Sequence, residues 1–361
     1  MSELRPIPIS RPHFGPEEEA AVLEVMRSGQ LAQGARVEAF EQAFAQATGA
    51  QYAVATANGT TALFLALLGH GIGAGDEVIT SPLTFIATAN AISQTGARPV
   101  FGDVDDSLNL NPRAAAALIG PRTRAIVPVH LHGNPAEMDA FTRLAERHGL
   151  ALIQDACQAV GARFDGRPLG TLGTAVYSFY ATKNLTTGEG GMVVTNDAAV
   201  ASRCASLRHQ AYSSTPYLHD AIGYNFRMTE MQAAIGIVQL RRLDEITSRR
   251  RSTANLYNEA ISHSRFARPT VRRSDVHVYY QYTLRTPDEA TRDTTRRRLD
   301  QAAIATGVYY PVPVHQQPPY RDLRSEPCPN AEDAARDMFS IPVHPLVSDD
   351  DRDRIVAVLA G

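Results

Sequence analysis

Residues 178–185 of the chain read Ser178-Phe-Tyr-Ala-Thr-Lys183-Asn-Leu185, and Lys183 is the only lysine in 361 residues. The 35 lysine and arginine residues are therefore this lysine and 34 arginines. Arginine supplies surface charge and ion pairs, but its guanidinium stays protonated and offers no free amine. A primary amine can condense with a carbonyl group, which arginine cannot do. The sequence therefore indicates a chemical role for the amine at position 183, with arginine-rich coding as the alternative explanation.

Two short apolar strands are predicted on either side of Lys183, at Ala175–Ser178 and Met192–Thr195, with a tight turn at Gly188–Gly191. Toward the N-terminus, short apolar runs alternate with helical patterns. The other predicted strands are 52–56, 77–80, 99–101, 125–129 and 151–154, and the predicted helices include 16–29, 37–49, 62–68, 83–94, 112–119 and 135–148. This alternation predicts an α/β fold with a mostly parallel sheet that helices cover on both faces.

Two polar features follow predicted strands at the sheet edge where ligands of such folds collect. Asp155 comes directly after the strand 151–154, although an aspartate in this place is also a common helix cap. Asn58-Gly59-Thr60-Thr61 lies between a strand and a helix, where unpaired first-turn amides and the helix dipole favour an anion. Simple N-capping by Asn58 or Thr60 explains the same residues. The sequence thus predicts a carboxylate and a candidate anion site.

The pattern changes in the last third of the chain. A long helical stretch at 228–261 is followed by His277–Leu284, which alternates like a half-buried strand. The segments 292–306 and 348–359 have helical patterns. We therefore expect a large domain at 1–245, which includes an N-terminal arm, and a small α+β domain at 246–361.

Composition argues against several classes of protein. The net charge of −3 and the lack of a basic run with interleaved aromatics argue against nucleic-acid binding. Cys157, Cys204 and Cys328 are odd in number and lack metal-ligand spacing, so we expect neither a disulfide frame nor a metal site. No apolar run approaches ~20 residues and the N-terminus is not a signal peptide, which predicts a cytoplasmic protein without a membrane partner.

A single amine, a carboxylate at a strand end and an anion site at a helix start are together the parts that pyridoxal 5′-phosphate needs. The amine would form a Schiff base with the cofactor, and the carboxylate would keep the ring nitrogen protonated. The helix start, with a nearby hydroxyl, would hold the phosphate. The sequence therefore favours an enzyme that uses this cofactor.

The chain resembles the DegT/DnrJ/EryC1/StrS family of pyridoxal-phosphate aminotransferases, which are sugar aminotransferases. The matching segments cover almost the whole chain in the family's order. They read NGTTALFLALLGHGIGAGDEVITSPLTFIATANAI, TRAIVPVHLHGNPAEMDA, DACQAVGARFDGRPLGTLG, SFYATKNLTTGEGGMVVTND, GYNFRMTEMQAAIGIVQLRRLDE, GVYYPVPVHQQPPYRD and SIPVHP. The resemblance implies the aspartate-aminotransferase-like fold (fold type I), with a large, mixed but mostly parallel sheet domain and a small C-terminal α+β domain.

The resemblance also implies roles for individual residues. Lys183 would form the Schiff base and move the proton between the substrate carbon and the cofactor. Asp155 would pair with the pyridinium nitrogen. The remaining cofactor contacts would be Gln158 near the ring hydroxyl, Phe85 flat on the ring, and Gly59, Thr60 and Ser178 at the phosphate. Phe85 as an ordinary core aromatic, and Ser178 as a strand hydroxyl bonded to backbone, remain alternative interpretations.

Two further implications concern the partner subunit and the substrate. Asn225, in GYNFRM, would reach the phosphate of the partner subunit's cofactor, so a homodimer with a shared active site is expected. Tyr310 and His315, in GVYYPVPVHQQPPYRD, would line the substrate pocket, although a histidine near prolines is as often structural.

The reaction implied is amino transfer, because some relatives that replace this lysine with histidine are dehydratases. A donor such as L-glutamate would load the cofactor as pyridoxamine 5′-phosphate, and the amine would then pass to a keto sugar. We expect a nucleotide-linked sugar in amino-sugar, natural-product or surface-polysaccharide biosynthesis. KNLTTGEGG resembles members acting at C4, whereas YYPVPVHQQPPY resembles those acting at C3.

Other functions stay open at this point. The chain departs from the family at Gln30, His132, Cys157 and most of all between Leu207 and Gly223, in a region that shapes substrate access in this fold. The ketone could therefore be a cyclitol or another secondary metabolite without a nucleotide. A lyase or cyclase on the same scaffold, and a non-catalytic homologue that only binds the cofactor, are the remaining alternatives.

Overall fold

A seven-stranded mixed sheet forms the centre of the computed structural model, which describes residues 5–215, 217–261, 265–323 and 326–360. The strand order is β1 (Tyr52–Thr56), β9 (Gly191–Thr195), β8 (Thr174–Ser178), β5 (Ala151–Asp155), β4 (Thr123–Val127), β2 (Glu77–Thr80) and β3 (Arg98–Phe101). Strands β8, β5, β4, β2 and β3 are parallel to one another, whereas β9 runs antiparallel to β1 and β8. The predicted α/β class with a mixed, mostly parallel sheet is therefore confirmed.

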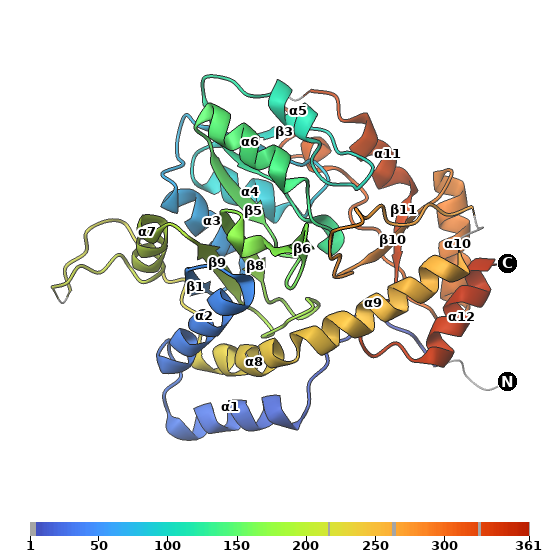
Figure 1. Ribbon diagram of the computed structural model, residues 1–361, viewed down its shortest axis with the longest axis horizontal. Helices are drawn as coiled ribbons and strands as arrows, with labels where there is room; N and C mark the ends of the chain where they lie inside the picture. The colour runs from blue at the N-terminus through green and yellow to red at the C-terminus, as the bar shows by residue number, and fades with distance from the viewer. Residues whose placement is uncertain (1–4, 216, 262–264, 324–325, 361) are drawn as a thin grey trace.

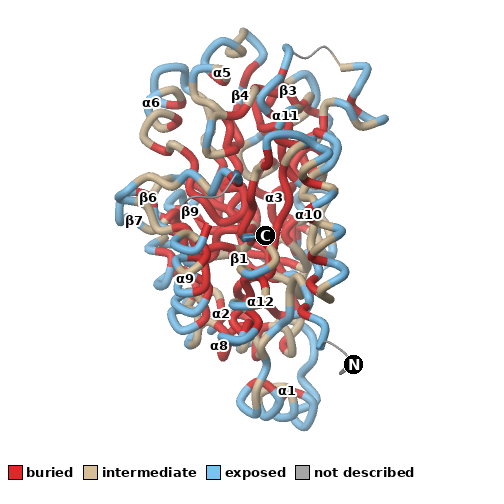
Figure 2. Tube along the Cα trace, turned by 90° about the vertical axis from the view of Figure 1, so that its right-hand side faces the viewer, coloured by how far each residue is buried: buried red, intermediate tan, exposed pale blue. Residues whose placement is uncertain are grey.

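Helices cover both faces of this sheet, as expected for parallel strands joined by crossovers. One face packs against α2 (Ala35–Thr48), α5 (Pro112–Ala117), α6 (Met138–His148) and α8 (Glu230–Arg241). The other packs against α3 (Gly59–Gly69), α4 (Ala87–Gln94) and α7 (Ala198–Arg208). Successive strand residues alternate between the two cores, since Val193 belongs to one while Met192 and Val194 belong to the other. Figure 2 shows buried chain through the middle of the molecule, with α1 exposed at its edge.

The helical stretch predicted at 228–261 is two helices rather than one. Thr229 and Gln232 form a capping box that starts α8, and the chain breaks at Arg242 before α9 (Leu243–Ala260) begins. Helix α1 (Pro16–Ser28) packs along α8. Figure 1 shows α9 leading from the sheet to the C-terminal elements.

The C-terminal elements surround a small antiparallel pair, β10 (Tyr282–Arg285) and β11 (Met338–Ile341). Around it lie α10 (Glu289–Gln301), α11 (Pro329–Asp337) and α12 (Asp349–Ala360). The two strands, α10 and α12 share a core of their own, which includes Tyr257 of α9 and Ile7 of the N-terminal segment. Helix α11 packs instead against Leu83 and Val104. The domain boundary between residues 245 and 246 stays a prediction.

The strand predicted at 277–284 is wrong in its first half, because β10 begins only at Tyr282. Tyr279 has a φ of 45°, which no strand accommodates. The His277 ring stacks on the Tyr279 ring at 4.0 Å, and the His277 Nδ1 accepts a hydrogen bond from the Tyr279 amide. This local contact turns the chain toward the large sheet instead of extending the small one.

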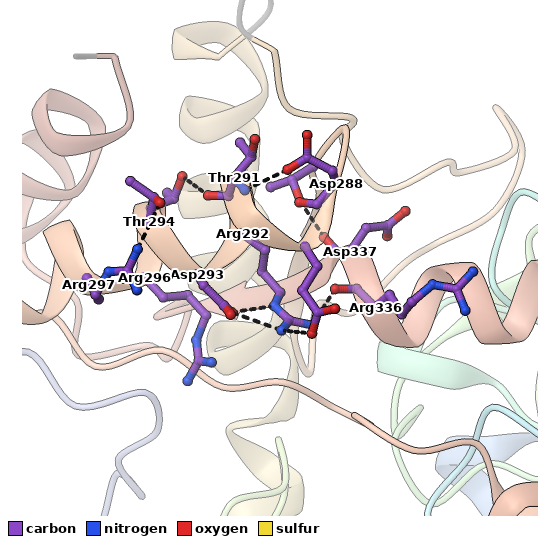
Figure 3. A network of polar contacts seen from close by, with 12 residues as sticks. Asp288, Thr291, Arg292, Asp293, Thr294, Arg296, Arg297, Arg336 and Asp337 are labelled. Carbon is purple, nitrogen blue, oxygen red and sulfur yellow. Dashed lines mark hydrogen bonds and ion pairs between the residues drawn. The ribbon is translucent and has the colours of Figure 1, made fainter.

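A polar network centred on Arg292 ties α10 to the end of α11 (Figure 3). The buried Arg292 guanidinium donates to the carbonyls of Ala335 and Arg336 and to the carboxylates of Glu289 and Asp293. Because the last carbonyls of a helix lack partners within the helix, an arginine that binds them stabilises the helix end.

Shorter elements complete the described chain: the hairpin β6 (Arg163–Phe164) and β7 (Arg167–Pro168), and the 3-10 turns Leu131–Gly133, Leu169–Thr171 and Val314–Gln316. The N-terminal segment crosses between the two parts of the molecule, since Ile7 pairs with Ile304 and His13 contacts Arg242. Among the described residues, none of the helices combines the length and apolar character needed to cross a lipid bilayer.

Candidate active site

A cavity of about 260 Å³ lies between the large sheet and the C-terminal elements. Its lining includes four of the predicted site residues, Phe85, Gln158, Lys183 and Tyr310, together with Tyr280 and Tyr309. A wider groove of about 660 Å³ runs along α9 and contains none of the predicted residues. Chemistry rather than size therefore marks the smaller cavity as the candidate active site.

Lys183 lies in the connection from β8 to β9 and reaches into this cavity. Its Nζ stands 4.3 Å from the centre of the Tyr280 ring, within the range of a cation–π contact. The Tyr280 hydroxyl is in turn 2.9 Å from the Thr182 hydroxyl, which restrains the ring. The amine is thus held in a defined place and has no carboxylate recorded beside it among the described ion pairs.

Asp155 ends β5 and is 7% exposed. Its Oδ2 accepts a hydrogen bond of 2.7 Å from the Thr88 hydroxyl, and its Oδ1 accepts one of 3.1 Å from the Cys157 amide. The contact with the Cys157 amide is a local capping interaction, so the alternative role of Asp155 as a cap is partly correct. The same carboxylate nevertheless stands at the carboxyl end of a parallel strand, where a ligand can meet it.

The start of α3 forms a close junction with the end of β8. A β-carbon placed on Gly59 would lie 2.7 Å from the Ser178 β-carbon and 3.0 Å from the Cys157 sulfur, so only glycine fits there. Asn58 caps the helix by accepting from the Thr61 amide. None of the hydrogen bonds recorded for the described residues uses the amides of Gly59 and Thr60. Capping and an anion site therefore coexist at this helix start.

Gln158 is held in one orientation by two hydrogen bonds. Its Oε1 accepts from the His132 amide at 2.7 Å, and its Nε2 donates to the Tyr310 hydroxyl at 3.1 Å. Burial lowers the pKa of His132 to about 4, so its neutral ring donates from Nε2 to the Tyr309 carbonyl at 3.2 Å. The backbone of residue 132 therefore fixes the amide of Gln158, whereas the His132 ring, which departs from the family pattern, contacts Tyr309.

Phe85 and Tyr310 form an aromatic wall, with ring centres 5.9 Å apart. Phe85 is 55% exposed although it lies in a well-packed region, which does not fit an ordinary core aromatic. Tyr180, Tyr280 and Tyr309 add further aromatic rings to the lining, and we did not predict them as site residues. For Tyr280, the high proportion of aromatic residues in His277–Tyr282 could have indicated a binding site, but we interpreted this segment as a strand.

Six predicted residues are not among those that line this cavity: Gly59, Thr60, Asp155 and Ser178, which lie close by, and His315 and Asn225. His315 is half-buried in the turn Val314–Gln316, with its Nε2 3.2 Å from a Glu332 carboxylate oxygen. Asn225 lies in an extended segment bridged to His209. The predicted roles of His315 toward substrate and of Asn225 toward the partner's cofactor stay predictions.

The donor set fits pyridoxal 5′-phosphate. The cavity offers an amine, an exposed aromatic face and an oriented amide, while a buried carboxylate and a glycine cradle beside a serine lie close by. Cys157 connects these parts. Its sulfur lies against Gly59, and its backbone amide donates a hydrogen bond to the Asp155 carboxylate. Burial raises the pKa of the Cys157 thiol well above its usual value, which keeps it neutral.

Comparison with known proteins agrees with this chemistry. Residues 12–360 match the model of the DegT/DnrJ/EryC1/StrS aminotransferase family. GDP-perosamine synthase of Caulobacter vibrioides is 40% identical over 367 residues, covering 99% of each chain. The structure of DesV from S. venezuelae has 40% identity and a TM-score of 0.91, covering 95% of this chain and 93% of that one. The PMP form of the putative sugar aminotransferase Spr1654 from Streptococcus pneumoniae has 25% identity and a TM-score of 0.94, covering 99% and 97%.

Proposed function

The chain belongs to the DegT/DnrJ/EryC1/StrS aminotransferase family, and from this premise we propose that it transfers the amino group of L-glutamate to a nucleotide-linked keto sugar. It is a pyridoxal-phosphate-dependent aminotransferase of a family of sugar aminotransferases, and its fold is that of these enzymes. The identity of the donor and the nucleotide on the acceptor are the proposed parts.

One observation carries the proposal: the sole lysine places its amine in the same cavity as Phe85, Gln158 and Tyr310. When bound, pyridoxal phosphate supplies a ring that accepts electrons from the carbon that loses a proton. Lys183 would hold the cofactor and carry a proton to and from the reacting carbon, a role worth on the order of 10²–10⁴ in rate.

The other residues would position the cofactor. Asp155 would face the ring nitrogen, and the free first-turn amides of Gly59 and Thr60, with the Ser178 hydroxyl, would bind the phosphate. Gln158 has one amide hydrogen left after its bond to Tyr310, which it can donate to the ring hydroxyl. Phe85 would cover one ring face and exclude water.

Two features support a sugar as the acceptor. A sugar ring presents C–H groups on its faces and hydroxyls at its edges, and the cavity offers aromatic faces together with the hydroxyls of Tyr280, Tyr309 and Tyr310. The relative GDP-perosamine synthase, 40% identical over nearly its whole length, carries a nucleotide-linked compound in its name.

We also propose that the active site is completed by a second copy of the chain. The segment that leads to Asn225 projects from the body of the molecule beyond α7, at the far left of Figure 1. It presents Tyr217 and Ile222, each 87% exposed, and Leu218, which is 54% exposed. Apolar side chains gathered on a projecting segment are typical of a surface that an assembly covers. A homodimer would bring Asn225 to the partner's cofactor phosphate.

A cytoplasmic location stays a prediction.

One observation favours a second candidate acceptor, a ketone without a nucleotide. Among the described residues that line the cavity, Lys183 is the only cation, since His132 is neutral. A diphosphate thus finds no counter-charge in this subunit's cavity and would need cations from elsewhere in a dimer. A cyclitol or similar neutral ketone has no such requirement.

The test is a screen of amino acceptors by mass spectrometry, with enzyme first loaded from L-glutamate. Nucleotide-linked 4-keto and 3-keto sugars and an uncharged cyclitol ketone are compared. Amination of a nucleotide-linked sugar supports the proposal, and amination of the cyclitol alone replaces it with the second candidate. If glutamate leaves the absorbance of the bound cofactor unchanged, the donor assignment is wrong. Borohydride reduction must also leave a cofactor adduct on the peptide that contains Lys183.

A further inference from the structure

We propose that Thr84 and Thr88 form a hydroxyl relay that positions Asp155 toward the cofactor ring, with Thr88 as a positioning residue of the reaction. The proposal rests on the proposed role of Asp155 at the ring nitrogen. The Thr88 hydroxyl lies 2.7 Å from Asp155 Oδ2 and 3.0 Å from the Thr84 hydroxyl.

The direction of each hydrogen bond follows from the chemistry of the carboxylate. An ionised carboxylate only accepts hydrogen bonds, so the Thr88 hydroxyl must donate its single proton to Asp155. The Thr88 oxygen is then left as an acceptor, and Thr84 donates to it. The chain therefore runs from Thr84 through Thr88 to Asp155 Oδ2, and charge assistance makes the last bond the stronger one.

Burial makes this relay consequential. Thr84, Thr88 and Asp155 are 3%, 1% and 7% exposed, so bulk water has little access to replace a lost donor. The Cys157 amide holds only Oδ1. Without the Thr88 hydroxyl, Oδ2 would lose its recorded partner and the carboxylate could rotate about its last bond. Removing one partner of a buried charged group leaves that group incompletely solvated.

The relay also joins two contacts that the cofactor would need. Thr84 directly precedes Phe85 in the turn that leads into α4, and Thr88 lies in the first turn of α4 itself. The same short segment therefore presents the aromatic face to the ring and supports the carboxylate at the ring edge. The start of α4 has no side-chain cap, so the Thr88 hydroxyl is not engaged in capping that helix.

The test compares Thr88→Val, which keeps the shape but removes the donor, with Thr88→Ser, which keeps the hydroxyl. We expect Thr88→Val to raise the cofactor dissociation constant about 10-fold or more, the size typical of a lost bond to a charged group. The absorbance maximum of the bound cofactor should shift in this variant. Thr88→Ser should bind and absorb within about 3-fold of wild type, and Thr84→Val should give an intermediate effect. Equal defects in Thr88→Val and Thr88→Ser would overturn the relay, because the methyl group would then be responsible.

A double-mutant comparison separates the relay from the proposed function. In an Asp155→Asn background, Thr88→Val should add little to the loss of cofactor affinity, because both changes break the same contact. Additive effects would show that Thr88 acts independently of Asp155 and would refute the relay alone. If Asp155→Asn itself binds cofactor with the affinity and absorbance of wild type, the assignment of Asp155 to the ring nitrogen fails, and the relay fails with it. Thermal unfolding of the cofactor-free variants, within ~2 °C of wild type, would exclude general misfolding as the cause.

Discussion

The side-chain nitrogen of Gln158 donates a hydrogen bond of 3.1 Å to the hydroxyl oxygen of Tyr310. Because the His132 amide occupies the Gln158 oxygen, this direction is fixed. The proton of the Tyr310 hydroxyl must then point elsewhere, toward the cavity that its side chain lines. Burial raises the pKa of Tyr310 far above its usual value, so the phenol keeps this proton at any working pH.

Tyr310 should therefore donate a hydrogen bond to the bound acceptor or cofactor. We expect Tyr310→Phe to lower kcat/KM for the keto acceptor about 10-fold, the scale of one hydrogen bond in a buried site. Single-turnover measurement of each half-reaction gives the comparison. Tyr52→Phe is the matched control, since it removes the hydroxyl of a partly exposed tyrosine on β1 that does not line the cavity. Equal losses in both variants would contradict the assignment.

Lys183 should be irreplaceable even by another cation. Lys183→Arg preserves the positive charge over Tyr280 but has no amine to condense with a carbonyl. We expect Lys183→Arg and Lys183→Ala to lose at least ~10²–10⁴ of the turnover rate while retaining loosely bound cofactor. Activity is followed with glutamate as the donor, and borohydride should leave no adduct on either variant. Substantial turnover by Lys183→Arg would show that charge rather than the amine is required.

Most of the architecture could be predicted from local sequence, because buried parallel strands are short apolar runs between helices. Glu77–Thr80 and Tyr52–Thr56 match their predicted limits. The helix predicted at 83–94 begins later, at Ala87, because the preceding residues form the turn that presents Phe85. The alternation of His277–Leu284 was misleading, since Tyr279 has a positive φ and Tyr280 lines the candidate cavity instead of a sheet face.

The site residues divide in a similar way. Lys183 and Asp155 could be predicted because a sole amine and a strand-end carboxylate are visible in the sequence itself. The contributions of Thr88, His132 and Tyr309 depend on contacts between segments far apart in the chain, such as the Thr88–Asp155 bond. The periodicity of apolar residues in the sequence does not reveal which distant residues will be in contact. The single chain also leaves Asn225 away from the cavity, so its role can only be tested in an assembly.

Stability should fall as the pH drops below about 6.5, the ordinary pKa of histidine. Burial lowers the pKa of His130 to about 4, and its Nδ1 accepts from the Ala136 amide while Nε2 binds Gln154. Between these pH values His130 binds a proton in the unfolded chain but not in the folded chain, so the free energy of unfolding decreases. Each such histidine contributes up to about 1.4 kcal/mol per pH unit.

The His130 contribution can be measured by urea unfolding at pH 7, 6 and 5. We expect His130→Gln to be less stable at pH 7 but to show a shallower loss of unfolding free energy on acidification. The exposed His148 serves as the control, and His148→Gln should keep the wild-type slope. An unchanged slope in His130→Gln would contradict this, because it would mean that His130 binds a proton as readily in the folded protein as in the unfolded chain.

Glu230 should be a major contributor to stability. From the first turn of α8, its buried carboxylate accepts hydrogen bonds from the amides of Gly34, Arg36 and Val37, which begin α2. A carboxylate at a helix N-terminus satisfies orphan donors and complements the helix dipole. Glu230→Gln should lower the unfolding free energy by about 1–3 kcal/mol, because the amide nitrogen cannot accept. The control is the exposed Glu38: in denaturant titrations Glu38→Gln should change the unfolding free energy by less than ~0.5 kcal/mol. An equally small effect of Glu230→Gln would contradict the role of Glu230 in stability.

Gly59 should tolerate no side chain, because the start of α3 touches the end of β8. A methyl group there would meet the Ser178 β-carbon at 2.7 Å and the Cys157 sulfur at 3.0 Å, closer than real β-carbon contacts allow. The helix start must then move away from Ser178, which opens the proposed phosphate cradle. We expect Gly59→Ala to weaken cofactor binding at least ~10-fold, as measured by titration of the cofactor-free protein. Gly120→Ala is the matched control, because a β-carbon at Gly120 meets nothing within 4 Å. Since Gly59→Ala replaces no functional group, wild-type affinity in this variant would show that the phosphate is bound elsewhere.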